Sequence, residues 1–316
     1  MARFGTKLLT RRTLLSGTMA LLSSCSQKAA KTRLALNWKP DPQFGGFYAA
    51  DYAKHGLDVE ILPGGAGTPT IQMVGAGSAE FGIVAADELV ITRSRGNNVV
   101  ALFATFQNSP QGIMVHSSRN LKSIGEVVKG GTLAIQKGLP YARILEKQYG
   151  FDKVRVVPSP GGDITAFLND ANFAQQCFLV SEPLAAKRKG ADVSAFAVSD
   201  LGYNPYTTVL ACSGDYLRDN LKTTQAMVAA VREGWRTYLD DPVPVNQKMQ
   251  QLNPSMAADI FTEVAAAQKN FIETDETRQG GLGIMNRERW SVLIGKLRDL
   301  GDITSAVAPE ECFKAL

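Results

Sequence analysis

The residues best suited to ligand chemistry stand at the ends of two short apolar runs. Asn37 and Trp38 follow apolar residues 34–36, and Asp87 and Glu88 follow apolar residues 81–84. Such runs predict strands, and in α/β folds the carboxyl ends of strands border the crevice where ligands bind. An aromatic ring, an amide and two carboxylates there predict a small-molecule site. The same residues also suit a core tryptophan and two acids that favour a helix N-terminus.

A glycine-rich turn precedes a helix predicted at residues 70–76. Gly65, Gly67 and Thr68 lie in this turn, directly after a strand predicted at residues 57–63. Because glycine has no side chain, the backbone N–H groups of such a turn approach an anion or a polar ligand closely. The turn lacks the lysine of a phosphate-binding loop, and its glycines equally suit a tight turn without a ligand.

Short apolar runs alternate with helical patterns along the chain. Strands are predicted at residues 99–106, 132–135 and 207–213, and the chain after residue 215 carries apolar residues at helical spacing. This alternation predicts an α/β fold with mixed, mainly parallel sheets. A chain of 316 residues exceeds a comfortable single core, so we expect two lobes.

The first 24 residues have the features of a signal peptide. Four basic residues and no acid precede the apolar residues 13–22, a stretch too short to span a bilayer. Small residues then lead into Cys25, as in lipoprotein signals whose cysteine is acylated, and Arg11–Arg12 is also typical of a twin-arginine signal. We expect export by the twin-arginine or the general secretory route, a lipid anchor on Cys25 at the periplasmic face of a bacterial membrane, and a linker over residues 25–31.

Charge and composition exclude several classes of function. The formal net charge of +4 equals the charge of the four basic residues in the leader, so the exported chain is near neutral and no nucleic-acid partner is expected. The chain has only two histidines, His55 and His116, and its four cysteines show no metal spacing. We therefore predict no catalytic residues, no metal and no cofactor.

Three phrases together support a family resemblance. The segment 34–50, the strand-like 57–61 and the phrase Gly-Ser-Ala-Glu-Phe-Gly at 77–82 resemble ABC-transporter substrate-binding proteins of the thiamine-pyrimidine, alkanesulfonate and nitrate-taurine type, which share the fold of thiamine-pyrimidine synthases. The resemblance implies a two-lobed periplasmic-binding-protein-like fold of type II, with a ligand cleft and two hinge strands. It places lobe 1 at 32–115 and 207–316, with the C-terminal helices, and lobe 2 at 116–206. It also implies a monomer that delivers its ligand to an ABC permease and ATPase.

The resemblance also assigns roles to individual residues. Trp38 is expected to stack on a heteroaromatic ring, with Asn37 beside it, while Glu182 or Asp87 accepts hydrogen bonds from the ring's amino group. Relatives carry a glycine-aromatic turn at Gln136–Lys137 and a Gln-Gly-Trp turn near Glu182, so this chain departs from the pattern there. The expected ligand-binding set is Asn37, Trp38, Phe44, Gly65, Gly67, Thr68, Asp87, Glu88, Gln136, Lys137, Glu182, Tyr203 and Tyr206.

The sequence favours a thiamine-pyrimidine precursor as ligand and leaves three alternatives open. An alkanesulfonate or other organic anion would use Lys137 and the glycine-rich turn, against the charges of Asp87 and Glu88. A flavin-like solute would also stack on Trp38, because stacking does not set ring size. A thiamine-pyrimidine synthase is the least favoured alternative, because such enzymes carry a cysteine-rich iron motif that this chain lacks.

Overall fold

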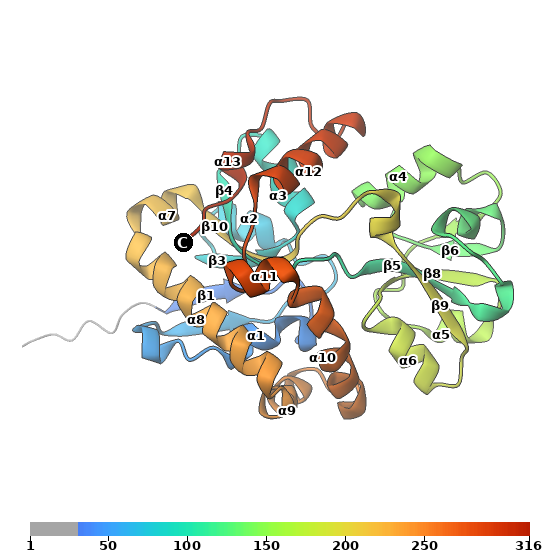
Figure 1. Cartoon of the computed structure of the whole chain (residues 1–316), viewed down its shortest axis with the longest axis horizontal. Coiled ribbons are helices and arrows are strands. Elements are labelled where there is room, and N and C mark those ends of the chain that lie inside the picture. Colours follow the sequence, from blue (N-terminus) through green and yellow to red (C-terminus); the bar gives the residue numbers. More distant parts are fainter. Residues whose placement is uncertain (1–30) are drawn as a thin grey trace, which may run out of the picture. The chain divides into compact units, whose positions relative to one another are not determined.

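The computed structural model describes residues 31–316. Cys25 and the predicted signal peptide therefore lie outside the described residues. The described chain forms two five-stranded sheets with helices packed around them (Figure 1). The prediction of a two-lobed α/β fold is confirmed.

The first sheet defines lobe 1. Its strands are β1 Thr32–Ala35, β2 Val59–Leu62, β3 Phe81–Val84, β4 Val99–Phe106 and β10 Thr207–Ser213, in the order β2-β1-β3-β10-β4. Strands β2, β1 and β3 are parallel, whereas β10 runs antiparallel to both β3 and β4. Every residue of β3 and β4 is buried, which explains why continuous apolar runs marked these two strands so clearly.

The second sheet defines lobe 2 and repeats this arrangement. Its strands are β5 Gln111–His116, β6 Thr132–Ala134, β7 Arg155–Val157, β8 Phe173–Phe178 and β9 Val193–Ala197, in the order β7-β6-β8-β5-β9. Strands β7, β6 and β8 are parallel, and β5 is antiparallel to β8 and β9. In each sheet the antiparallel strand is the one reached directly from the other lobe. Because β5 belongs to this sheet, the second sheet begins ahead of the lobe boundary expected at residue 116.

The chain passes between the lobes twice, through residues 107–110 and 202–206, here called the two crossing segments. Asn204 joins them, because its side-chain oxygen accepts a hydrogen bond from the Ser109 N–H at 2.8 Å and its amide donates to Asn108 Oδ1 at 3.3 Å. The Arg289 Nε donates to the Asn204 carbonyl at 3.0 Å. Both crossing segments are therefore fixed to each other and to a helix of lobe 1.

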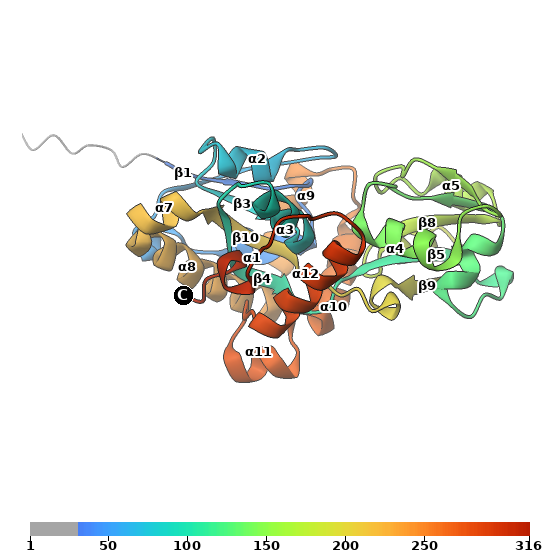
Figure 2. The same cartoon turned by 90° about the horizontal axis from the view of Figure 1, so that it is seen from above.

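The helices lie in the connections between strands and in the C-terminal part of the chain (Figures 1 and 2). They are α1 Gly45–Ala49, α2 Thr70–Gly75, α3 Ala86–Ser94, α4 Pro140–Tyr149, α5 Thr165–Asn169, α6 Glu182–Arg188, α7 Gly214–Asp219, α8 Leu221–Asp240, α9 Val243–Leu252, α10 Ala258–Ile272, α11 Asp275–Gly280, α12 Arg287–Asp299 and α13 Pro309–Cys312. Within residues 31–316, none of these has the length and apolar character needed to cross a bilayer.

The first helix differs from its prediction. The sequence pattern predicted one helix over residues 47–54, but α1 ends at Ala49 because Ala50 is extended, with φ −63° and ψ 129°. A short 3-10 turn, η2 Ala53–His55, follows and ends at Gly56, which has a left-handed φ of 73°.

Helix α1 packs closely on the long helix α8, and both views place them side by side (Figures 1 and 2). A Cβ at Gly234 of α8 would overlap the Gly46 carbonyl, and a Cβ at Gly46 would overlap the Trp235 ring. The Phe47 and Trp235 rings meet edge to face, with centroids 5.9 Å apart. Since α1 follows β1 after only a short 3-10 turn, η1 Pro42–Phe44, this packing fixes the far end of the segment that carries Asn37 and Trp38.

We predict opposite effects for two glycine-to-alanine changes inside helices. Gly234→Ala should lower the free energy of unfolding by about 2 kcal/mol or more, because the added methyl overlaps the α1 backbone. Gly295→Ala in α12 has open space around the new Cβ, so it should raise stability by up to about 1 kcal/mol through helix propensity. Chemical denaturation of both variants checks this, and equal effects would contradict the close α1–α8 packing.

Candidate functional site

The segment after β1 brings Asn37 and Trp38 to the carboxyl end of the first sheet. The Gly64 N–H donates to the Trp38 carbonyl at 3.1 Å, which ties this segment to the end of β2. The Asn37 side-chain oxygen is buried and accepts no hydrogen bond from any described residue. Trp38 is partly buried against the core of lobe 1. An unused acceptor therefore lies beside an aromatic ring that is not fully covered.

Asp41 adds a carboxylate to this edge and is held from two sides. It accepts hydrogen bonds from the Gln43 backbone N–H and from Gln43 Nε2, both at 3.0 Å. Burial raises the pKa of Asp41 to about 7, against the effect of the Gln43 hydrogen bonds, and the negative charge of Glu182 adds to the rise. Glu182 belongs to lobe 2, so the two carboxylates approach each other from different lobes.

Two hydrogen bonds connect Asp41 to strand β10 through Gln43. The Thr208 hydroxyl donates to Gln43 Oε1 at 3.3 Å, and Gln43 in turn holds Asp41. Thr208 has a φ of 53°, a left-handed conformation that is strained for a β-branched residue. It is the second residue of β10, where the chain re-enters lobe 1. Asp41 is therefore linked to this strand through the side chains of Gln43 and Thr208.

Asp87 and Glu88 form a second acidic group, in the first turn of α3. Asp87 is 5% exposed and accepts a hydrogen bond from the Tyr203 hydroxyl at 2.8 Å. Burial raises the pKa of Asp87, although the Tyr203 hydroxyl opposes this effect. Burial, together with the charge of Asp87, raises the pKa of the partly buried Glu88 to about 7.

Lobe 2 contributes a glycine turn and a carboxylate. Gly161 and Gly162 have φ values of 63° and 94°, which L side chains rarely adopt. A Cβ at Gly161 would lie 3.5 Å from the Trp38 ring, and one at Gly162 would lie 3.6 Å from Glu182 Oε1 and 4.0 Å from the Trp38 ring. The two glycines therefore let the backbone of lobe 2 approach both Trp38 and Glu182.

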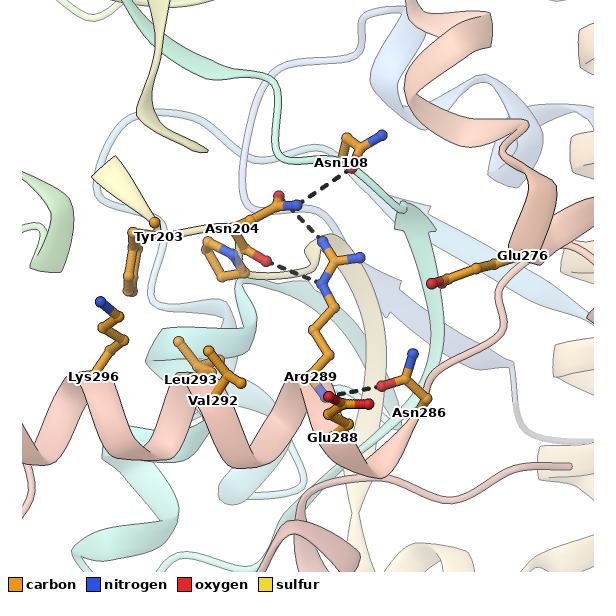
Figure 3. Close-up of a pocket in the computed structure, with 12 residues that line it drawn as sticks. Asn108, Tyr203, Asn204, Glu276, Asn286, Glu288, Arg289, Val292, Leu293 and Lys296 are labelled. Carbon is orange, nitrogen blue, oxygen red and sulfur yellow. Dashed lines mark hydrogen bonds between the residues drawn. The ribbon is translucent and has the colours of Figure 1, made fainter. Parts of the chain in front are cut away.

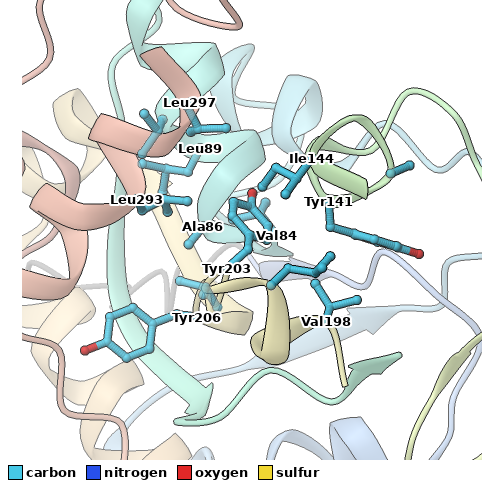
Figure 4. Close-up of a cluster of buried hydrophobic side chains, with 14 of the residues drawn as sticks. Val84, Ala86, Leu89, Tyr141, Ile144, Val198, Tyr203, Tyr206, Leu293 and Leu297 are labelled. Atoms are coloured by element: carbon cyan, nitrogen blue, oxygen red, sulfur yellow. The ribbon is translucent and has the colours of Figure 1, made fainter. Parts of the chain in front are cut away.

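Glu182 is the first residue of α6 and faces this group of residues. Its Oε2 accepts a hydrogen bond from the Phe178 N–H at 2.8 Å, and burial raises its pKa. Burial raises the pKa of the Tyr141 hydroxyl, and the charges of Cys177, Glu182 and Asp87 add to the rise. Tyr141 and Tyr203 belong to one cluster of buried side chains that spans both lobes (Figure 4).

The acidic residues at this site lack a cationic partner. Asp41, Asp87, Glu88 and Glu182 form no ion pair with any residue of 31–316. A buried carboxylate without a cationic partner loses solvation, and the hydrogen bonds that it accepts offset only part of that loss. The arrangement can therefore accept hydrogen bonds from the N–H groups of a ligand whose ring lies on Trp38.

The other predicted site residues have different surroundings. Phe44 is fully buried in the core of lobe 1. Gln136 and Lys137 are exposed, and the Gln136 N–H donates to Gln176 Oε1 at 2.6 Å. The Tyr206 hydroxyl accepts from the Asn286 N–H at 3.1 Å, and the Arg289 guanidinium stacks 4.0 Å from the centre of the Tyr206 ring.

The glycine-rich turn is closed by its own hydrogen bonds. The Gly65 N–H donates to the Thr68 hydroxyl at 2.8 Å, and the Thr68 N–H donates to the Gly65 carbonyl at 3.1 Å. Gly67 is exposed with a φ of 80°. These contacts explain the glycines as parts of a tight turn. A ligand-binding role stays a prediction for this turn and for the other residues of the expected set.

The ligand-binding residues expected from the sequence do not include Asp41, Tyr141, Gly161 or Gly162. Asp41 stands between Pro40 and Pro42 in the very segment that carries Asn37 and Trp38, so its place in the chain was a usable signal. The other three meet the site only through packing between the lobes, and no local pattern marks them.

A separate pocket of about 360 Å³ lies beside the crossing segments (Figure 3). It is lined by Asn108, Asn204, Pro205 and residues of α11 and α12, among them Arg289 and Lys296. Burial lowers the pKa of Arg289, and its guanidinium is held by Asn204. Tyr203 lines this pocket and also donates to Asp87, so it is shared between the two places.

This two-lobed arrangement, with two crossing segments and polar residues where the lobes meet, is that of the periplasmic binding proteins. The structure is similar to that of the periplasmic aliphatic sulphonate binding protein SsuA from Escherichia coli, with a TM-score of 0.68, 14% identity, and coverage of 90% of this chain and 92% of that chain. Residues 41–244 match the family described as NMT1/THI5 like, which is more than half of the chain. The chain belongs to this family, and the resemblance stated from the sequence is confirmed.

Two curated relatives show the range of this family. The chain is 21% identical over 322 residues to the formylaminopyrimidine-binding protein of Halalkalibacterium halodurans, covering 93% of this chain and 95% of the relative. It is also 26% identical over 233 residues to the 4-amino-5-hydroxymethyl-2-methylpyrimidine phosphate synthase of Uromyces fabae, covering 67% and 68% respectively. Binding proteins and enzymes thus both occur among its relatives.

The raised pKa of Asp41 predicts a stability change with pH. Between about pH 4 and pH 7 the folded protein keeps a proton on Asp41 that the unfolded chain releases, so stability falls as the pH rises through this window. Asp41→Asn removes this contribution while keeping an acceptor for Gln43. The loss of stability between pH 5 and pH 8 should be smaller in the variant by on the order of 2 kcal/mol.

Denaturation of both proteins at each pH measures this difference. The exposed Asp152→Asn serves as the control, and it should follow the parent protein. An Asp41→Asn variant that lost as much stability as the parent would show that Asp41 is ionised and solvated in the folded state.

Proposed function

We propose that this protein is the solute-binding component of an ABC importer and that it captures a small heteroaromatic solute bearing an amino group. A thiamine-pyrimidine precursor is the ligand that fits best. The observation that carries this proposal is a buried carboxylate without a cationic partner, Glu182, which borders the Gly161–Gly162 turn together with the Trp38 ring. Asp41, Asp87 and Glu88 are further carboxyl groups without a cationic partner among residues 31–316.

The charge of the site supports an amino ligand over an organic anion. A sulfonate placed beside Trp38 would approach the acidic side chains of Glu182 and Asp41, whereas a protonated ring or an amino group donates to them. Lys137, the cation expected to serve an anion, is exposed. The similarity to the sulphonate-binding SsuA does not favour a sulfonate ligand for this chain, because at 14% identity it extends to the fold alone.

A flavin-like solute is the second candidate for the same surface. Its ring system would also stack on Trp38, and its ring N–H groups would donate to the same carboxylates. A Cβ added at Gly161 would already lie 3.5 Å from the Trp38 ring, so the space beside the ring is narrow in this arrangement of the lobes, which favours a smaller ligand ring. Competition between flavin and formylaminopyrimidine would rank the two.

A binding role is favoured over catalysis by the positions of the two histidines. His116 Nε2 lies 2.7 Å from the Phe167 carbonyl and its ring stacks on Phe167, and His55 Nε2 lies 3.3 Å from Glu233. Neither histidine is among the residues grouped around Trp38 and Glu182. We therefore propose that the chain binds and releases its solute unchanged, unlike the synthases to which it is similar.

Delivery would follow from closure of the two lobes. Trp38 and Asp41 come from lobe 1, and Glu182 and the Gly161–Gly162 turn come from lobe 2, so a ligand gains its full set of contacts only when both lobes reach it. This difference in affinity shifts the population toward the closed form. A permease with its ATPase would then recognise that form, and a monomer suffices for this task.

Loss of Trp38 tests the proposed function. Trp38→Ala should weaken binding of formylaminopyrimidine about tenfold or more, because both the stacking and the buried ring face are removed. Calorimetric titration measures the affinity, and circular dichroism should show an unchanged fold. Tyr149→Ala removes an aromatic ring that is 52% exposed and lies apart from the site, so it should bind as the parent does. Equal affinities for both variants would show that Trp38 packs in lobe 1 and does not stack on the ligand.

Export and lipid anchoring complete the proposal and rest on the sequence before residue 31. We propose that Cys25 is acylated at the periplasmic face of a bacterial membrane. Cys25→Ala should abolish incorporation of labelled fatty acid into the protein and release it from the membrane fraction. The matched Cys312→Ala, a buried cysteine, should keep the label. Equal labelling of parent and Cys25→Ala would contradict the anchor.

A further inference from the structure

Arg188 crosses from lobe 2 to lobe 1. It is the last residue of α6, and its Nε donates to Glu263 Oε1 at 2.8 Å while its Nη1 lies 3.4 Å from Asp259 Oδ2. Both acids belong to α10 of lobe 1. Its neighbours Lys187 and Lys189 are exposed, and the Arg188 side chain is itself about half exposed, at 49%.

An apolar contact lies next to this ion pair. Val180 of lobe 2 is buried together with Ile260 and Val264 of α10, and Leu184 and Ala185 of α6 pack against them. Every member of this small cluster comes from residues 178–185 or from residues 256–271. This cluster therefore joins residues of both lobes. We call the ion pair and this cluster the α6–α10 contact.

The same short helix carries the proposed ligand contact at its other end. Glu182 and Arg188 are the first and last residues of α6, about 9 Å apart along its axis. A helix of this length moves as a rigid element, so the α6–α10 contact and the approach of Glu182 to Asp41 form together. Arg188 itself touches none of the residues grouped around Trp38.

A second contact between the lobes is made by helix α4. Lys147 Nζ of α4 donates to the Asp299 carbonyl at 2.9 Å, and Arg143 pairs with Asp302. These residues border the large cluster that also contains Tyr203 and Tyr206 of the second crossing segment. That contact packs with the second crossing segment, whereas the α6–α10 cluster meets the first one, because the Phe271 carbonyl accepts hydrogen bonds from the Gln107 and Asn108 N–H groups.

We propose that Arg188 is a positioning residue that sets ligand affinity through the α6–α10 contact, by favouring the closed arrangement of the lobes without touching the ligand. The proposal rests on the proposed function, because affinity is one of its readouts. The apparent dissociation constant equals the intrinsic one divided by the closed fraction. Any interaction present only in the closed form therefore raises affinity from a distance.

Charge reversal makes the effect large enough to measure. An exposed ion pair by itself contributes little, but Arg188→Glu places a third acid beside Asp259 and Glu263 and turns attraction into repulsion. We expect formylaminopyrimidine to bind about three- to tenfold more weakly. The ligand-free variant should also show a larger radius of gyration in solution scattering than the parent.

Two further variants separate this role from a general loss of stability. Arg188→Glu combined with Glu263→Arg restores an ion pair of opposite polarity, so it should recover most of the affinity and the parent's radius. Arg236→Glu breaks a comparable pair, Arg236 to Glu273 at 2.6 Å, whose two members both belong to lobe 1. It should leave affinity and radius unchanged.

The outcomes of these experiments decide the proposal. An unchanged radius and affinity for Arg188→Glu, or a double variant that recovers neither, would overturn it. If formylaminopyrimidine binds none of the proteins, the proposed ligand is wrong, but scattering of the ligand-free variants still decides the α6–α10 contact. A radius that grows in Arg188→Glu and returns in the double variant supports the contact whatever the ligand is.

Discussion

Buried carboxyl groups without a cationic partner are the constraint on which the site depends. Asp41, Asp87 and Glu182 are carried by three different connections, and each is placed where burial disfavours its ionised form. Hydrogen bonds from Gln43, Tyr203 and the Phe178 N–H compensate only part of that cost. A ligand that donates N–H groups would supply the rest, so the same groups that lower stability in the free protein create its affinity and its selectivity.

The fold explains how these charges come together. In each sheet the antiparallel strand is the one next to a crossing segment, and the carboxyl ends of the parallel strands carry the loops with the polar residues. Asn204 and Arg289 hold the two crossing segments, while Tyr203 in the same segment reaches Asp87. The strained Thr208 follows directly and supports Asp41 through Gln43. The same few residues therefore contact both the crossing segments, about which the lobes would move, and the acidic groups of the site.

The sequence predicted those parts of the fold that local patterns determine. Strands β4 and β10 were predicted with the bounds they have, because each contains an apolar run and the structure buries almost every residue of both strands. Helix α1 was predicted too long, since the apolar spacing continues past Ala50 although the backbone there is extended. The grouping of Trp38 with Glu182 rested on resemblance, because these residues lie far apart in the chain. Tyr141 and the Gly161–Gly162 turn were missed for the same reason: only tertiary packing brings them to the site.

The most direct test compares two ligands that differ in one group. Calorimetric titration would measure binding of 4-amino-5-hydroxymethyl-2-methylpyrimidine and of the analogue in which hydrogen replaces the 4-amino group. If the carboxylates recognise that amino group, its removal leaves buried acceptors unpaired, and affinity should fall about 100-fold. Equal affinity for both compounds, or tighter binding of an alkanesulfonate, would contradict the assignment of the acidic residues as the basis of recognition.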